Sequence, residues 1–108
     1  MAHTISPQTR NALSVLGSQI AAARRGQRRT LADTAERVGV SITTLRKIEA
    51  GNPGVAIGTV FEAASILSVP LFDAEGPRLA ELAATGRREL ALLPARVRRR
   101  TIEIDDDF

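Results

Sequence analysis

The stretch TLADTAERVGVSITTLRKIEAG, residues 30–51, decides the fold, because it contains two short helical patterns separated by a tight turn. Thr30 and Ser41 stand directly before these patterns and are favoured N-cap residues, whose side-chain oxygens accept a backbone N–H of the first turn. Apolar residues follow each cap at spacings of three and four, which is typical of one buried helix face. Gly39 lies between the patterns and allows the left-handed backbone that the turn requires. Two steeply crossing helices, a helix-turn-helix, are therefore expected.

Similar signals predict three further helices around this pair. Ser6 followed by Pro7 is a favoured helix start, and Pro70 marks the end of a later helix. Aromatic residues make up only 3% of the chain, so the core is built from Ala, Leu, Ile and Val, which suits packed helices. The predicted class is all-α. Its five helices cover about residues 7–26, 30–38, 41–50, 58–67 and 77–86, and in an alternative interpretation the last one continues to Leu93.

The charge distribution divides the chain into a basic body and an acidic end. There are 15 Lys and Arg against 12 Asp and Glu, yet four of these acids fall within the last six residues. A basic body favours a polyanionic partner, and an acidic end favours a different one. We therefore expect a domain over residues 1–93 and a tail over 94–108. Residues 101–104 alternate as a strand does, and such a strand needs a partner strand, such as that of a second subunit; otherwise this end is disordered.

The second helix of the pair has an inward and an outward side. Leu45 and Ile48 hold it against the body of the domain, at the spacing of one helix face. The core does not need the remaining side chains, which are polar, cationic or at the helix start. These outward residues are Ile42, Thr43, Thr44, Arg46 and Lys47.

Taken together, these features resemble the helix-turn-helix of the phage-repressor, or XRE, family. The matching residues are Ala35, Gly39-Val40-Ser41, Thr44-Leu45 and Ile48-Glu49-x-Gly51. The resemblance covers about residues 13–72 and implies a lambda-repressor-like fold that binds DNA. Leu31 stands where the family usually has Gln, so one customary DNA contact is missing. Thr34 stands where the family usually has Leu, which makes the core slightly less apolar.

The resemblance also assigns the residues that read bases. The family's reading positions fall on Ile42, Thr43 and Lys47, with Arg46 close by. A Thr hydroxyl bonds to a base edge, a Lys reaches guanine acceptors, and an Ile packs on a thymine methyl group. For Ile42 the alternative is a partly buried position at the helix start.

Phosphate contacts are expected beside the reading helix, from hydroxyl groups, helix N-termini and a basic loop. Arg24 and Arg25 belong to this basic cluster of four arginines within six residues, and the alternative for each arginine is a solvated surface position. Glu49 faces the body of the domain in this family and is expected to serve structure. The residues assigned to phosphate contacts are Arg28, Arg29, Thr30, Ser41 and Thr44.

Two further segments carry a narrower resemblance. EAGNPGVAIGTVFEAASILSVPLFD (49–73) and LLPARVRRRTIEIDDDF (92–108) are similar to HipB-type antitoxins, whose partners are HipA-type Ser/Thr kinase toxins. This resemblance implies a homodimer that binds a palindromic operator and a kinase toxin, and that represses its own operon. The tail would enter a basic groove on the kinase, with the terminal aromatic ring as anchor; the alternative is a disordered acidic end. The tail residues concerned are Asp105, Asp106, Asp107 and Phe108.

Other function classes compete with this interpretation. A stand-alone repressor without a toxin would share the DNA surface, and an interaction module would use the fold without DNA. An enzyme is disfavoured, because the chain has no Cys, its one His is His3, and it has no Gly-rich phosphate loop. No catalytic residue, metal or cofactor is therefore expected. Because no signal-peptide pattern and no apolar run of about 20 residues is found, we expect a cytoplasmic protein associated with the nucleoid.

Overall fold

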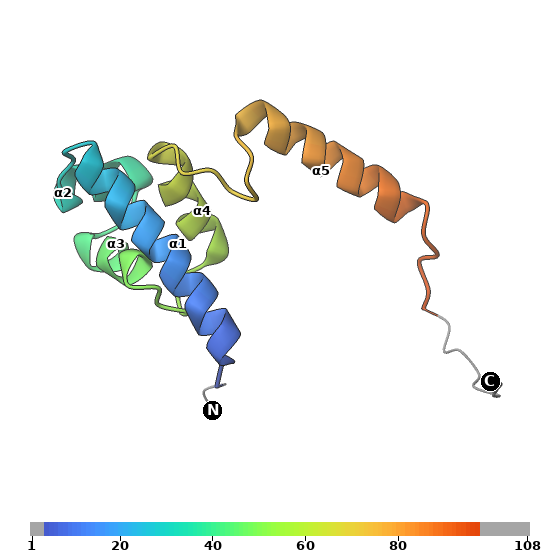
Figure 1. The fold of residues 1–108 in the computed structure, drawn as a ribbon, viewed down its shortest axis with the longest axis horizontal. Coiled ribbons are helices and arrows are strands. Elements are labelled where there is room, and N and C mark those ends of the chain that lie inside the picture. Colours follow the sequence, from blue (N-terminus) through green and yellow to red (C-terminus); the bar gives the residue numbers. More distant parts are fainter. Residues whose placement is uncertain (1–3, 98–108) are drawn as a thin grey trace. The chain divides into compact units, whose positions relative to one another are not determined.

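The computed structural model describes residues 4–97, and this range contains five helices (Figure 1). Within it no strand forms, although Leu71 and Ala74 make an isolated bridge, so the all-α class is confirmed. None of these five helices is both long enough and apolar enough to cross a membrane. The helices are α1 (Pro7–Gly26), α2 (Leu31–Val38), α3 (Ile42–Glu49), α4 (Ile57–Ile66) and α5 (Gly76–Ala91).

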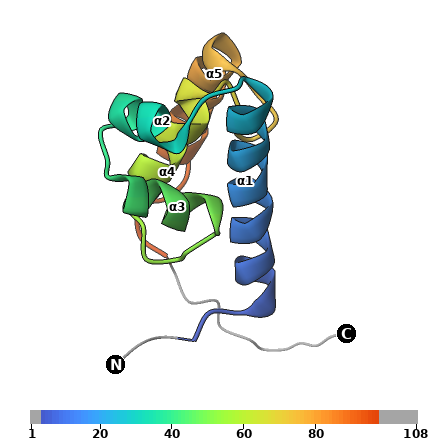
Figure 2. The same cartoon turned by 90° about the vertical axis from the view of Figure 1, so that its left-hand side faces the viewer.

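The chain forms two compact units, one ending at Glu75 and the other beginning at Gly76. The first unit holds α1 to α4. In it α3 contacts both α1 and α2, and α2 also contacts α4. Figure 2 shows α1 along one side of this unit, with the other three helices beside it. The second unit contains α5, and the domain boundary expected at residue 94 stays a prediction.

The expected helix starts are confirmed for the first three helices. The Ser6 hydroxyl accepts the N–H of Thr9, and Pro7 is the first residue of α1. The Thr30 and Ser41 hydroxyls cap α2 and α3 in the same way, each at 3.0 Å. Two later boundaries differ: α4 begins at Ile57 without a side-chain cap, one residue earlier than expected, and α5 runs on to Ala91, close to the longer interpretation.

The first four helices end with one shared backbone motif. After each helix a residue takes a positive φ, and the next N–H bonds back to a carbonyl five residues earlier, as in a Schellman ending. Gly39 and Gly51 take this conformation without strain, with φ of 88° and 76°. Arg28 and Ser68 take it at 58° and 60°, where a side chain makes the conformation less favourable. The closing bonds are Arg29 to Arg24, Val40 to Ala35, Asn52 to Lys47 and Val69 to Ala64.

The core of the first unit is aliphatic and lies where the four helices meet. Ile20, Leu45 and Leu67 are the largest apolar side chains that are almost completely buried. Thr34 is also completely buried, and its hydroxyl has no hydrogen-bond partner within the described residues. An unpaired buried hydroxyl costs about 1–3 kcal/mol, so the polar residue at this position weakens the core, as the sequence indicated.

Helix α1 approaches the end of α3 so closely that only a glycine fits between them. A Cβ atom added to Gly17 would lie 2.6 Å from the carbonyl oxygen of Glu49 and 2.7 Å from that of Ile48. Gly51 lies against α1 in turn, since its Cβ would be 3.0 Å from the backbone of Leu13 and Ser14. These are backbone atoms, which cannot move aside as a flexible side chain does. The two glycines therefore set the distance between α1 and α3.

We expect Gly17→Ala to destabilise the protein by about 1–3 kcal/mol, because the new methyl group forces α1 and α3 apart. Gly26→Ala is the matched control in the same helix, since a Cβ there meets no atom within 4 Å. Alanine is the better helix former, so the control is expected to be neutral or stabilising by up to about 1 kcal/mol. Urea unfolding followed by circular dichroism measures both variants. Equal effects would contradict the close approach.

Candidate nucleic-acid interface

Helix α3 is held by its inner face and leaves its outer face in solvent. Leu45 is completely buried and Ile48 is 2% exposed, whereas Thr43, Arg46 and Lys47 are exposed. Ile42, for which a partly buried position was the alternative, is 39% exposed, so part of its side chain is accessible at the helix start. Thr44 was expected to face outward with the others, but it is half-buried. The exposed residues assigned to base reading therefore form one continuous polar and cationic surface with a single aliphatic residue.

Hydroxyl groups mark the starts of both helices of the pair. The Ser41 hydroxyl accepts the Thr44 N–H and donates to the Thr44 Oγ1 at 3.1 Å. The Thr30 hydroxyl accepts the N–H of Asp33, so its own hydrogen is available to an acceptor. Helix N-termini attract anions because their N–H groups and the helix dipole point outward. These two starts are thus chemically suited to phosphate oxygens.

The cationic side chains assigned to DNA contacts differ in how far they are engaged within the molecule. Among residues 4–97, Arg28, Arg46 and Lys47 take part in no salt bridge. Arg29 instead donates to the side-chain oxygen of Gln27 at 3.0 Å and to Asp33 at 3.5 Å. Arg28 is therefore better placed to meet an external anion than Arg29.

The most extensive side-chain interaction of the unit joins α1 to α3. The Nε and Nη2 atoms of Arg24 donate to the two carboxylate oxygens of Glu49, at 2.6 and 3.2 Å. The Nη1 atom of Arg24 also donates to the backbone carbonyl of Arg29 at 2.9 Å. Both side chains of the ion pair are only 10% exposed. One guanidinium thus fastens the end of α1, the loop that follows it, and the last residue of α3.

This pair corrects one part of the predicted phosphate cluster. Arg24 was grouped with the arginines that would contact DNA, but its guanidinium is buried and its hydrogen bonds are made inside the protein. The hydrogen bonds that Arg24 donates to Glu49 raise the pKa of Arg24, against the lowering effect of burial, so this group stays charged. Glu49 serves structure, as expected. Sequence spacing could not reveal the pair, because its members stand 25 residues apart.

The structure adds a neighbour to the reading helix that the sequence did not assign. Thr44 and Lys47 line a hollow of about 330 Å³ together with the loop that leads into α4, including Asn52 and Thr59. The Asn52 side chain accepts the N–H of Gly54 at 2.7 Å and shapes this loop. The Asn-Pro-Gly signal was interpreted only as a turn, and its place beside Lys47 follows from the tertiary fold.

These geometric features define a class of protein, a small helical unit with a helix-turn-helix whose second helix is capped and has an exposed cationic face. The family model described as helix-turn-helix matches residues 20–73, half of the chain. The chain therefore belongs to the helix-turn-helix family of the XRE type, whose members are DNA-binding transcription regulators. No curated protein shows a significant match to this chain.

Breaking the Arg24–Glu49 pair on one side is expected to destabilise the protein strongly. Glu49→Gln leaves a buried guanidinium without its counter-charge, which costs about 3–5 kcal/mol. Replacing both partners, as Arg24→Met with Glu49→Leu, removes the unpaired charge and is expected to recover most of this loss. Asp33→Asn, which removes the carboxylate of two more exposed ion pairs, is the control and costs about 0–1 kcal/mol. Urea unfolding measures the stability of all three variants. A loss of stability for Glu49→Gln no larger than that of the control would contradict this role.

Proposed function

We propose that this protein is a homodimeric transcriptional repressor that reads a palindromic operator with α3. The observation that carries this proposal is the exposed face of α3, where Thr43, Arg46 and Lys47 project from a helix whose other side is locked into the core. Two copies related by a twofold axis would place two such helices about 34 Å apart, in successive major grooves of an inverted repeat.

Within this proposal the side chains divide into base readers and phosphate contacts. Thr43 and Lys47 hydrogen-bond to base edges, Ile42 packs on a thymine methyl group, and Arg46 reads a neighbouring base. Phosphate contacts fix the register without carrying sequence information. They come from Arg28, Arg29, Thr30, Ser41 and Thr44. Because Leu31 replaces the customary Gln at the start of α2, base discrimination rests more heavily on α3.

The two groups predict different responses to substitution. Thr43→Ala is expected to weaken binding to the operator by about 5- to 150-fold and to spare binding to random DNA, because a base contact discriminates by about 1–3 kcal/mol. Arg28→Gln is expected to weaken binding to the operator and to random DNA alike. It is also expected to reduce the magnitude of the slope of log K against log salt concentration by about 0.9. Arg10→Gln, outside the helix-turn-helix, is the charge-matched control.

Footprinting on the protein's own upstream region, followed by titrations at several salt concentrations, measures these effects. Protection of an inverted repeat that Thr43→Ala abolishes would support the proposal. A folded protein that protects no site, or that binds all DNA with equal affinity, would overturn it.

We further propose that the protein is the antitoxin of a HipA-like Ser/Thr kinase, which it neutralises while repressing their shared operon. The support is the resemblance of residues 49–73 and 92–108 to HipB-type antitoxins. The tail residues assigned to the kinase, Asp105 to Phe108, lie outside the residues that the structure describes. The alternative is a stand-alone repressor, which needs the same DNA surface and no kinase.

Co-expression with the neighbouring gene separates these two possibilities. We expect a kinase-like protein to co-purify with the full chain, and Phe108→Asp to weaken that association without changing operator binding. Arg10→Gln again serves as the control. Absence of any co-purified kinase, with operator binding intact, would leave the stand-alone repressor as the function.

A further inference from the structure

The segment that joins α1 to α2 contains three of the residues assigned to phosphate contacts, at positions 28–30. Arg24 binds both backbone groups of the middle residue of this segment. Its carbonyl accepts the N–H of Arg29 at 3.0 Å, and its Nη1 atom donates to the Arg29 carbonyl at 2.9 Å. Gln27 adds a second attachment, because its side-chain amide donates to the Leu67 carbonyl at the end of α4. The backbone of this segment is therefore fixed within the first unit.

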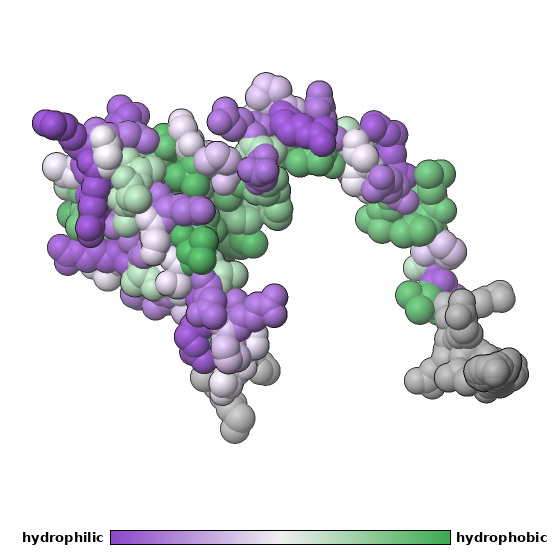
Figure 3. Space-filling model, viewed as in Figure 1, coloured by the Kyte–Doolittle hydropathy of each residue, from purple (hydrophilic) through white to green (hydrophobic). Residues whose placement is uncertain are grey.

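The side chains of the same segment remain accessible to solvent. Arg28 and Thr30 are exposed, and Arg29 is half-buried. Figure 3 shows hydrophilic side chains gathered over the end of α1 and over α2, the two helices that this segment joins. A rigid backbone that carries accessible cationic and hydroxyl groups is suited to phosphate oxygens, which such groups bind without reading the base sequence.

The same guanidinium also reaches α3. Its Nε and Nη2 atoms donate to the carboxylate of Glu49, the last residue of that helix, at 2.6 and 3.2 Å. Lys47, which is assigned to base reading, lies only two residues earlier. All three nitrogen atoms of the Arg24 guanidinium are thus bonded, two to α3 and one to the segment before α2. Because a guanidinium is planar and its donors form a rigid fork, it holds its acceptors at a fixed spacing.

This spacing matters because phosphate contacts and base contacts must be made at the same time on one duplex. Phosphate contacts fix the register of the protein, and the base readers act only if that register brings them to the base edges. Binding residues must be held within about 0.5 Å of their productive positions. A shift of α3 relative to residues 28–30 would therefore cost base contacts even if every side chain of both groups were intact.

We propose that Arg24 is a positioning residue for base discrimination, because its guanidinium sets the distance between residues 28–30 and the exposed face of α3. This inference rests on the proposed function, since it concerns the preference for the operator over random DNA. Without Arg24 each of the two surfaces still meets DNA, but the two no longer meet it in register. Affinity for random DNA depends on phosphate contacts and does not need this link, whereas affinity for the operator does.

Replacing both partners, as Arg24→Met with Glu49→Leu, removes the link and keeps the net charge of the chain. We expect the ratio of operator affinity to random-DNA affinity to fall at least about fivefold, the equivalent of one base contact. Random-DNA affinity is expected to change less than about twofold, with the same slope of log K against log salt concentration. Circular dichroism verifies that the variant is folded. Arg24→Lys is a second variant, which keeps the charge but lacks the rigid fork, and the ratio is expected to fall for it as well.

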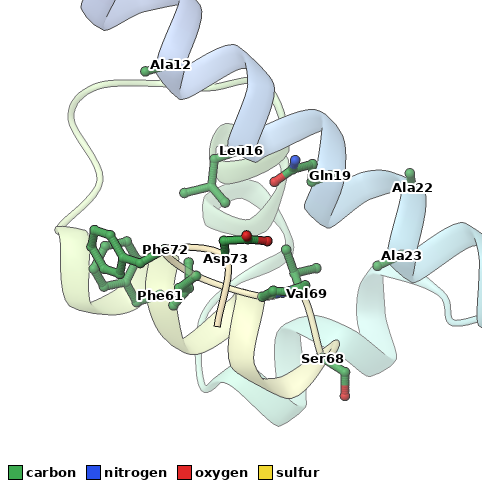
Figure 4. Close-up of a pocket in the computed structure, with 12 residues that line it drawn as sticks. Ala12, Leu16, Gln19, Ala22, Ala23, Phe61, Ser68, Val69, Phe72 and Asp73 are labelled. Carbon is green, nitrogen blue, oxygen red and sulfur yellow. The ribbon is translucent and has the colours of Figure 1, made fainter. Parts of the chain in front are cut away.

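Val69→Ala is the control that separates positioning from stability. Val69 is 9% exposed and lines an open apolar groove of about 890 Å³, which Phe72 also borders (Figure 4). Neither residues 24–30 nor any residue of α3 lines this groove, so the substitution leaves the link intact. The loss of buried methyl groups is expected to lower the urea midpoint of unfolding and to leave the affinity ratio unchanged.

Titrations with the operator and with random DNA at several salt concentrations distinguish the outcomes. An unchanged ratio in both Arg24 variants, or an equal fall for Val69→Ala, would overturn the positioning role. A smaller salt slope in the variant that lacks both partners would also overturn it, because Arg24 would then contact a phosphate itself. A wild-type chain that binds both DNAs equally would overturn the proposed function and this role with it, and that result is recognised before any variant is made.

Discussion

The bidentate contact of Arg24 with Glu49 controls how α3 is held in the first unit. Helix α3 has only eight residues, too few to be stable alone in water, so its orientation comes from what it packs against. The guanidinium fastens its last residue to α1 and to the loop before α2. Gly17 brings α1 against the carbonyls of Ile48 and Glu49 at the same place. The ion pair and the close approach that Gly17 allows together position α3, and the outer face of this helix stays exposed.

In this arrangement the two faces of α3 have different roles. The inner face of α3 is completely committed to the core, and the four helix endings of the unit are closed by the same backbone hydrogen bonds. Substitutions on the outer face can therefore change what is bound without changing the fold. Helix α5 stands in contrast, because none of its residues is buried within the chain.

Local sequence signals predicted the fold of this molecule better than its candidate DNA-binding site. The helix pair over residues 30–51 was found because a cap, an apolar spacing and a glycine act within one or two turns of chain. The positive φ at Arg28 and Ser68 was missed, since neither residue type marks that conformation. Arg24 was placed among the DNA contacts because a run of arginines looks the same in sequence whether or not one of them is buried. Its partner lies 25 residues away, and no spacing rule links them.

The sequence by itself determined the class of the fold, the starts of the first three helices and the side of α3 that faces the core. These depend on hydrogen bonds and apolar periodicity within a few residues. Only the tertiary structure decided which arginine is structural, how close α1 comes to α3, and that Lys47 shares a hollow with the Asn52 loop. The groove beside Phe72 also appears only there. Burial and charge pairing are properties of segments that meet in space, so they emerge once the helices are packed.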